Sequence, residues 1–473
     1  MLEKIRTLLL SPYYSIFLLL LSAIGYTVGG NALIAVLMIE VQLVALVLCL
    51  SDDLAPVLLP TLCVIVLGTT LIGKMELITP WIPYGLTLVP AFVFHFICYR
   101  RAKVLCRGVT LSGLIATAAA ILLSGIGNLD STDYTDPTVW YYLCGMSVLP
   151  IVLYLIFASE VKREKRYDQM EYFLGVLVYV GILSAAVIGV NFVKWAFYTE
   201  GALQVKDYFD LIPYRNTIAN ILLLCLPAPF YFAGYAEKHP ALEIASFSVG
   251  CLFYGAMVLT AARTAMLFGS ILLLISLVYY FVSKRAWYYK VLNFVIVAAL
   301  ITLLAYYLLE PITQLITSRL DGGLASVDEA RWKLLLRSIS DFKEHPLFGI
   351  GFCSTENADI YAADGCISWY HLYFPQIWGS LGLVGCVAFL YQLAIRARLA
   401  IFRPNATTVA LALSYLGILL YSQTDPGEFV PIPFAALAVL IFVYLEKHYE
   451  NEKGRTTWFF KCSDLIKKEK SLP

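Results

Sequence analysis

The chain has 473 residues, of which 60% are apolar and only 14% are charged, and its formal net charge is +1. Soluble domains carry roughly a quarter charged residues, so this composition excludes one or two soluble domains and indicates a protein embedded in lipid. The net charge by itself identifies no partner.

Apolar stretches that suit a lipid bilayer follow one another almost from end to end. A spanning helix needs about 20 predominantly apolar residues, and fourteen such runs can be counted. They cover residues 13–28, 31–50, 56–73, 81–99, 109–127, 139–159, 173–197, 214–234, 241–260, 264–282, 288–309, 371–393, 405–424 and 428–445. The sequence therefore predicts an all-α polytopic membrane protein with about 14 transmembrane helices, within a range of roughly 12 to 14.

The positive charges indicate how these helices are oriented. Lysines and arginines gather between alternate spans, at 4–6, 100–107, 162–166, 284–290, 396–403 and 447–470. The segments between them are acidic or neutral, for example 128–138 and 424–429. Because basic loops stay in the cytoplasm, we expect an inner-membrane protein with both termini cytoplasmic. The first apolar run lacks a small-residue cleavage site, which predicts a retained anchor.

One long segment, residues 310–370, interrupts the apolar runs and is expected on the extracytoplasmic side. Long ordered loops usually carry function. Within it, 328–342 (DEARWKLLLRSISDF) has apolar residues at helical spacing, which predicts an amphipathic helix at the outer interface. The following segment, 345–351 (HPLFGIG), is typical of a tight turn. Cys353 and Cys366 also fall in this loop and form either a disulfide or two free thiols.

Three ionisable side chains are expected at the extracytoplasmic boundary. Arg215 lies in PYRNTIAN, Arg263 in LTAARTAM, and His371 in WYHLYFPQ. Charged groups beside membrane spans are costly and point to function by default. In the simpler interpretation each arginine reaches lipid headgroups and the histidine is an interfacial polar residue. Their arrival from three segments at one depth favours a common site.

The chemistry of these side chains suits a phosphorylated substrate. A guanidinium matches phosphate oxygens in pairs, so two of them suit a pyrophosphate, and a histidine can take a proton from a hydroxyl. Of the five histidines only His345 and His371 are expected outside, and His345, which precedes a proline, favours a structural or capping role. Glu40, inside the second run, is either a proton-coupling site or a protonated, hydrogen-bonded carboxyl, and we favour the second interpretation.

Several patterns are missing from the sequence. It has no His/Cys cluster with metal-ligand spacing, no acidic pair in the first outer loop and no P-loop. We therefore expect no cofactor, no metal site and no nucleotide hydrolysis, and nothing predicts a nucleic-acid partner.

The polar segments together resemble the O-antigen ligase and polymerase family, membrane glycosyltransferases of bacterial surface-polysaccharide assembly. The resemblance covers about 208–389 and rests on four segments in the family's order. These are Arg215 with Asn216 and Ala219; Arg263 in its motif; Ala330 to Gly351 with Arg331 and Trp332; and His371 with Tyr373, Gln376, Gly379, Gly382 and Gly385. The chain departs from the family at Ala262, where Ser or Gly is common, and at Leu372, where Asn is common. Fourteen spans also exceed the number usual for the ligase branch.

This resemblance implies a GT-C-like fold and transfer of a glycan from an undecaprenyl-pyrophosphate carrier to an acceptor hydroxyl outside the cytoplasm, without metal or nucleotide. Arg215 and Arg263 would hold the pyrophosphate, Arg331 would bind phosphate or brace the loop, and His371 would be the general base. The expected division is 1–207 for N-terminal transmembrane helices, 208–309 for the helices with both arginine motifs, 310–370 for the loop, 371–445 for C-terminal transmembrane helices and 446–473 for a cytoplasmic tail.

Other functions remain as alternatives. A lipid-linked oligosaccharide flippase or other multi-pass transporter would use the Pro- and Gly-interrupted spans and Glu40. A scaffolding protein explains neither the arginines nor the loop. The glycosyltransferase hypothesis implies a lipid-linked donor, a glycan or lipid-core acceptor, a flippase and a chain-length regulator as partners, and leaves both polymerase and ligase open.

Overall fold

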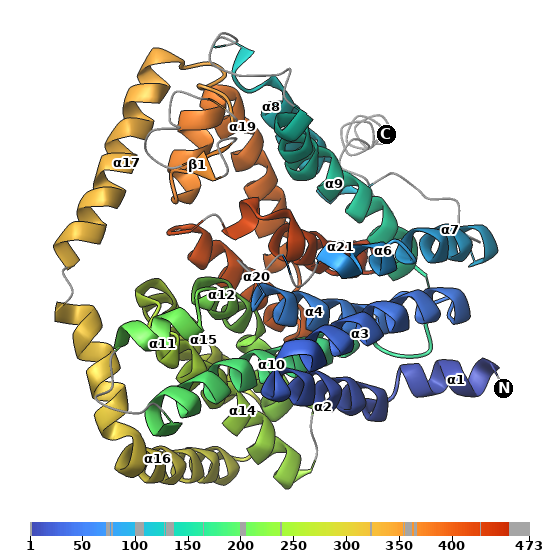
Figure 1. Ribbon diagram of the computed structural model, residues 1–473. Coiled ribbons are helices and arrows are strands. Elements are labelled where there is room, and N and C mark those ends of the chain that lie inside the picture. The colour runs from blue at the N-terminus through green and yellow to red at the C-terminus, as the bar shows by residue number, and fades with distance from the viewer. Residues whose placement is uncertain are drawn as a thin grey trace, which may run out of the picture. The chain divides into compact units, whose positions relative to one another are not determined.

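The computed structural model describes residues 2–71, 76, 79–99, 108–126, 128, 137–163, 165–198, 205–236, 239–321, 324–352, 354, 362–363, 367–425 and 427–453. Helices make up almost all of this part of the chain (Figure 1). The chain divides into two compact units, each described by itself. The first unit comprises Met1–Arg101, Lys165–Leu324 and Leu413–Tyr421, and the second comprises Ala102–Glu164, Ala325–Ala412 and Ser422–Pro473.

The helices of the first unit come mainly from the N-terminal two thirds of the chain. They are α1 (Leu2–Leu9), α2 (Pro12–Val28), α3 (Gly30–Leu50), α4 (Ala55–Thr69), the 3₁₀ helix η1 (Thr79–Trp81), α6 (Ile82–Gly85), α7 (Leu88–Tyr99), α10 (Gln169–Tyr198), α11 (Val205–Leu211), α12 (Arg215–Cys225), α13 (Pro227–Tyr231), the π-helix η3 (Phe232–Ala236), α14 (Pro240–Leu259), α15 (Arg263–Val282) and α16 (Trp287–Asp321).

The second unit holds the remaining elements. They are α8 (Val109–Leu123), α9 (Pro137–Val161), α17 (Leu324–Glu344), the antiparallel pair β1 (Ala362–Ala363) and β2 (Ile367–Ser368), α19 (Tyr373–Ile401), the 3₁₀ turn η5 (Gly427–Phe429), the π-helix η6 (Pro431–Ala435) and α21 (Ala436–Lys453). The helix α20 (Ala406–Ser422) is shared between the units.

Nine helices in the described part of the chain are long and apolar enough to cross a membrane. They run over Gly30–Leu50, Thr79–Tyr99, Val139–Val161, Gln169–Phe197, Arg215–Tyr235, Pro240–Leu259, Arg263–Val282, Tyr373–Ile401 and Pro431–Glu452. The bent helix α16 is a tenth candidate, and α2, α4, α8 and α20 are shorter apolar helices. Each of the fourteen predicted apolar runs falls on one of these helices. The chain is therefore a polytopic helical membrane protein.

The helix α16 differs from the prediction that the long loop begins at residue 310. Its parts Trp287–Leu303 and Leu308–Thr317 are bent by 85°, and helical structure continues to Asp321. Pro311 falls in the first turn of the second part. The first turn of a helix has no internal partner for its N–H groups, so a proline there removes no helical hydrogen bond. Pro311 is thus compatible with the start of a new helix.

Small residues let the helices of the first unit approach one another closely. A Cβ atom on Gly181 of α10 would overlap the ring of Phe253 in α14, and one on Gly250 would lie 2.7 Å from the ring of Phe230. In lipid, close packing of this kind holds helices together in place of the hydrophobic effect. It encloses α12 and α13, which are buried beyond the first turn of α12.

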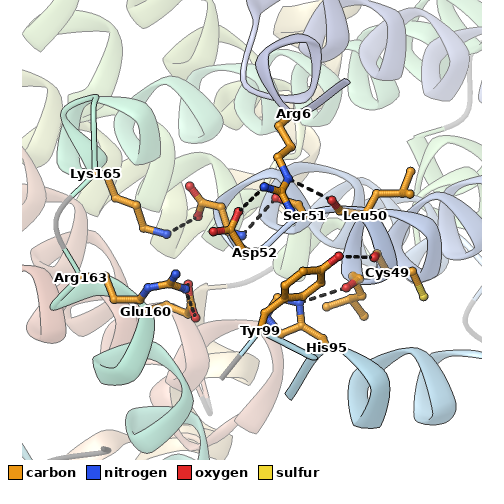
Figure 2. A network of polar contacts seen from close by, with 12 residues as sticks. Arg6, Cys49, Leu50, Ser51, Asp52, His95, Tyr99, Glu160, Arg163 and Lys165 are labelled. Atoms are coloured by element: carbon orange, nitrogen blue, oxygen red, sulfur yellow. Dashed lines mark hydrogen bonds and ion pairs between the residues drawn. The ribbon is translucent and has the colours of Figure 1, made fainter. Parts of the chain in front are cut away.

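The C-terminal end of α3 is tied to α7 by side chains that bind its last carbonyl groups (Figure 2). Tyr99 Oη donates to the carbonyl oxygen of Cys49 at 2.7 Å, and His95 Nδ1 donates to that of Leu48 at 3.0 Å. A helix end leaves such carbonyl groups without a backbone partner. His95, which is 2% exposed, therefore has a structural role.

A buried carboxylate joins α8, α9 and α21 in the second unit. Glu446, which is 1% exposed, accepts hydrogen bonds from Thr110 N at 3.0 Å, Tyr154 Oη at 2.8 Å and Lys162 Nζ at 3.0 Å. Burial lowers the pKa of Lys162, but the carboxylates of Glu446 and Glu450 outweigh burial and raise it. Lys162 therefore keeps the charge that compensates Glu446.

Candidate functional site

Arg215 opens α12 after the short turn that follows α11. Its backbone N donates to the carbonyl oxygen of Ile212 at 3.1 Å, which sets the start of the helix. Its guanidinium lies 4.0 Å from the centroid of the Phe209 ring. A cation this close to an aromatic face is held by the ring quadrupole. The half-buried side chain is thus kept beside the first turn of α12.

A hydrogen-bonded group from two other helices supports Arg215. The hydroxyl of Tyr214 lies 3.0 Å from that of Tyr26 in α2, and Asn191 of α10 donates to Tyr26 Oη at 2.5 Å. The same amide donates to the carbonyl oxygen of Val187 at 2.9 Å. Burial raises the pKa of Tyr214, so this phenol stays protonated. The N-terminal helices therefore fix the residue that precedes Arg215.

Arg263 occupies the first position of α15, after a three-residue turn that ends α14. Ala261 in this turn has φ +50°, a left-handed conformation that costs a residue with a side chain roughly 1 kcal/mol or more. Ala262 N donates to Thr260 Oγ1 at 3.3 Å, which holds the turn from within. The turn directs the chain from one membrane helix into the next and leaves Arg263 half-buried at the junction.

Tyr208 joins the two arginine segments. This fully buried residue of α11 packs on the indole of Trp195, with ring centroids 5.1 Å apart, and its hydroxyl donates to the carbonyl oxygen of Leu259 at 2.7 Å. Leu259 is the last residue of α14, four positions before Arg263. Burial raises the pKa of Tyr208, and the charge of Arg215 offsets this only in part. The Tyr208 hydroxyl therefore stays protonated, and its hydrogen bond links the segment before Arg215 to the segment before Arg263.

The two arginines lie at helix N-termini that have no side-chain cap. Tyr214 and Ala262, the N-cap residues of α12 and α15, make no capping hydrogen bond through their side chains, and the two helices pack against each other. The first N–H groups of a helix lack internal partners, and the helix dipole is positive there. A cation at this position is unfavourable alone, whereas an anion would gain from the dipole and from the guanidinium together. The arrangement suits a phosphate-type anion.

In the second unit, the turn at 345–351 inserts at a break in α19. The backbone N of Ile350 donates to the carbonyl oxygen of Gly379 at 3.1 Å, and the N of Leu383 donates to that of Pro346 at 2.8 Å. These bonds replace helical bonds that are lost at the break. The predicted tight turn therefore completes the backbone hydrogen bonding of α19 at its break.

Gly382 is the residue at which α19 breaks, with φ 62° and ψ −155°. A Cβ atom there would lie 2.6 Å from Gly349 N and 2.6 Å from the carbonyl carbon of Leu347. Gly349 has φ +68°, and a Cβ on it would overlap the backbone of Ser380. Both positions require glycine, for the backbone conformation and for the close approach of two backbones.

The break folds the first part of α19 back on the second. The rings of Tyr373 and Phe389 lie 6.2 Å apart between centroids, whereas a straight helix would separate residues at this spacing by about 24 Å. Residues 373–381 and 383–401 are thus two helices. The run predicted over 371–393 falls on the candidate span Tyr373–Ile401, but the break at Gly382 was not predicted, because an apolar pattern does not reveal a reversal at one glycine.

His371 lies just before the folded-back helix and has φ +53°. Its Nδ1 is 3.9 Å from Asp425 Oδ1, and the two side chains are 33% and 26% exposed. The preceding residue, Tyr370, is held by a hydrogen bond from its N to Gln376 Oε1 at 2.9 Å and by one from its hydroxyl to Asp341. A histidine oriented by a carboxylate is a common form of general base. Asp425 is absent from the sequence-based site, where its segment served only to indicate orientation.

Arg331 contacts the same segment as His371. Its Nη2 donates to the carbonyl oxygen of Thr424, next to Asp425, at 3.1 Å. Of the two roles expected for Arg331, phosphate binding and bracing, this hydrogen bond favours bracing.

The predicted site residues thus fall into two clusters. Arg215 and Arg263 belong to the first unit, where Tyr208 links the segments that precede them, and Arg331 and His371 contact neighbouring residues of the second unit. Cys353 and Cys366 lie outside the described residues.

The fold defines a polytopic membrane protein, with two arginines at helix starts in one unit and a histidine near a carboxylate in the other. Residues 247–390 match the family described as O-antigen ligase. The match confirms the resemblance read from the residues and contains Arg263, Arg331 and His371, while Arg215 precedes it. A search of curated proteins found no match. The family match and the membrane helices together support a membrane glycosyltransferase role.

Proposed function

We propose that this protein is a polysaccharide polymerase or O-antigen-ligase-like enzyme. It transfers a glycan from an undecaprenyl-pyrophosphate carrier to an acceptor hydroxyl on the extracytoplasmic face of the bacterial inner membrane. Both termini are cytoplasmic in this arrangement. The observation that carries the proposal is the link through Tyr208 between two uncapped helix starts, each of which begins with an arginine.

Arg215 and Arg263 would bind the pyrophosphate of the donor. As the bond between the anomeric carbon and the phosphate oxygen breaks, its electron pair stays on the pyrophosphate. The added negative charge is stabilised by groups that are already oriented toward it. Guanidiniums keep their charge under all physiological conditions and bind phosphate oxygens in pairs. The leaving group remains attached to its lipid.

His371 would deprotonate the acceptor hydroxyl. Because Nδ1 faces Asp425, Nε2 is the nitrogen that takes the proton, and the carboxylate stabilises the imidazolium that forms. The acceptor oxygen then bonds to the anomeric carbon from the side opposite the pyrophosphate, with inversion. Arg331 would keep the segment of Asp425 in place through Thr424.

Reconstituted protein with a lipid-pyrophosphate glycan donor and a labelled acceptor tests the proposal. We expect turnover in the wild type and a loss of about 100- to 10,000-fold in His371→Ala. His448→Ala is a matched control, because His448 Nε2 contacts only the backbone oxygen of Arg403 among the interactions described for it. Normal turnover of His371→Ala, or labelling of a cysteine at position 371 only from the cytoplasm, would sink the proposal.

The alternative of a lipid-linked oligosaccharide flippase rests on Glu40. This fully buried carboxylate of α3 accepts a hydrogen bond from Ser22 Oγ of α2, which fits the expected helix-to-helix bond. The two functions leave different intermediates in cells that lack the protein. Repeat units accumulate unpolymerised or unligated outside if it is a transferase, and remain on the cytoplasmic leaflet if it is a flippase.

A further inference from the structure

A buried ion pair joins Arg396 of α19 to Glu428 of the turn η5. The two side chains are only 4% and 8% exposed. Charge distribution along the sequence assigns Arg396 to the cytoplasmic side and Glu428 to the opposite side, but the fold brings them into contact inside the second unit. Neither residue belongs to the clusters described above.

Stability alone does not explain a buried ion pair at this position. Removing two charges from water costs several kcal/mol for each ion, and apolar residues of similar size often stabilise a protein as well or better. Apolar side chains lie near the pair: Arg396 is 5.1 Å from the ring centroid of Phe442, and a cavity beside the pair is lined by Phe389 and Val439 as well as by the polar Thr117 and Gln392. Charged residues inside membrane proteins mark function by default.

Glu428 belongs to a short segment that also carries Asp425. We call this segment, residues 422–425 and 427–430, the strap. Glu428 N donates to Ser422 Oγ at 2.9 Å, and Gly427 has φ +47°. At its other end the strap receives the hydrogen bond from Arg331 to Thr424. Glu428 lies three positions after Asp425 in the sequence, so the ion pair acts close to Asp425 along the chain.

The strap borders a cavity at the position where Phe429 packs. Phe429 lies 5.4 Å and 5.6 Å from the ring centroids of Tyr373 and Phe389. Tyr373 and Phe389 also line a cavity of about 40 Å³, which is bordered by Glu428, Phe429 and Pro431 of the same segment. A void of this size offers no contacts to hold the segment. The ion pair is a directional contact that holds the strap at this border.

We propose that Arg396 and Glu428 are positioning residues, which anchor the strap so that Asp425 stays against His371. This inference rests on the proposed function. The distance from His371 Nδ1 to Asp425 Oδ1 is already 3.9 Å, so a further displacement of about 1 Å would remove most of the orienting effect of the carboxylate. Donor binding by the arginine pair of the first unit does not depend on the anchor.

The test uses the full-length protein with Arg396→Met and Glu428→Met combined. Replacing both charges avoids an uncompensated buried ion, so we expect the variant to be recovered folded. We expect kcat to fall about 30-fold, while KM for the lipid-pyrophosphate donor changes less than about threefold. The matched control is Arg403→Met with Glu452→Met, an ion pair of the same unit that is 63% and 43% exposed; it should leave both constants unchanged.

Two single variants keep the inference testable if the double variant fails to fold. Arg396→Lys retains the charge and should reduce kcat less than about fivefold. Gly427→Ala displaces the strap while both charges of the ion pair are kept, because its Cβ would overlap Ser422, and should lower kcat as the double variant does. A kcat within about threefold of wild type in the double variant, or in Gly427→Ala, overturns the inference.

The same assay separates this inference from the function on which it rests. Wild-type protein without any transfer from the lipid-pyrophosphate donor contradicts the proposed function. Wild-type turnover with unchanged kcat in the strap variants contradicts the anchor alone. A rise in donor KM at constant kcat also overturns it, since the pair would then belong to donor binding.

Discussion

The two clusters of candidate site residues are built in different ways. In the first unit Arg215 and Arg263 begin ordinary membrane helices, and Tyr208 links their approaches. In the second unit His371 stands before a folded-back half-helix and meets a carboxylate from a separate strap. A helix start is thus enough to position an arginine, whereas the position of His371 beside Asp425 requires a broken helix and contacts from several segments.

Glycine substitutions probe this contrast most strongly. Gly382→Ala adds a Cβ 2.6 Å from two backbone atoms at a positive φ, so we expect a loss of about 3 kcal/mol or more of unfolding free energy and poor recovery of folded protein. Gly189→Ala in α10 is the control, because a Cβ there meets nothing within 4 Å. It should be neutral or stabilising by up to about 1 kcal/mol. Thermal unfolding in detergent measures both, and equal stability of the two variants would contradict the required break at Gly382.

Conservative changes of the arginines sharpen the role of the first unit. Lysine keeps the charge but loses the planar fork of donors. We therefore expect Arg215→Lys and Arg263→Lys each to lower kcat/KM about 100-fold, or about 2.7 kcal/mol, with folding intact. Arg403→Lys, at an exposed ion pair, is the control. Wild-type rates in either variant would remove that arginine from the pyrophosphate site.

Asp425→Asn probes the carboxylate that backs His371. The amide keeps the shape of the side chain but no longer stabilises an imidazolium, so we expect kcat to fall about 10- to 30-fold with little change in donor KM. Asp210→Asn, at an exposed position of α11 in the first unit, is the control. An Asp425→Asn enzyme as fast as wild type would show that His371 acts without its carboxylate.

The sequence predicts the residues of the two clusters to different degrees. Arg215 and Arg263 are predicted at the membrane boundary, because an apolar run begins beside each of them. Asp425 was missed because its partner, His371, is distant in sequence and meets it only through the reversal at Gly382. Loop charge assigned Arg396 and Glu428 to opposite sides of the membrane, although the two residues form an ion pair. The distribution of charge between spans carries no information about segments that turn back into the protein. The apolar pattern of a sequence therefore does not indicate where the backbone reverses direction.

The smallest effect is expected from the hydroxyl that joins the arginine segments. Tyr208→Phe removes only the hydrogen bond to the carbonyl oxygen of Leu259. A buried hydrogen bond contributes about 1 kcal/mol, so the spacing of Arg215 and Arg263 should loosen enough to raise donor KM about fivefold while kcat stays near wild type. Tyr254→Phe is matched to it, because its hydroxyl pairs with Ser270 at an exposed site between α14 and α15. An unchanged donor KM in Tyr208→Phe, beside an equally unchanged Tyr254→Phe, would mean that the two helix starts hold their spacing without this bond, and that the first unit depends on helix packing alone.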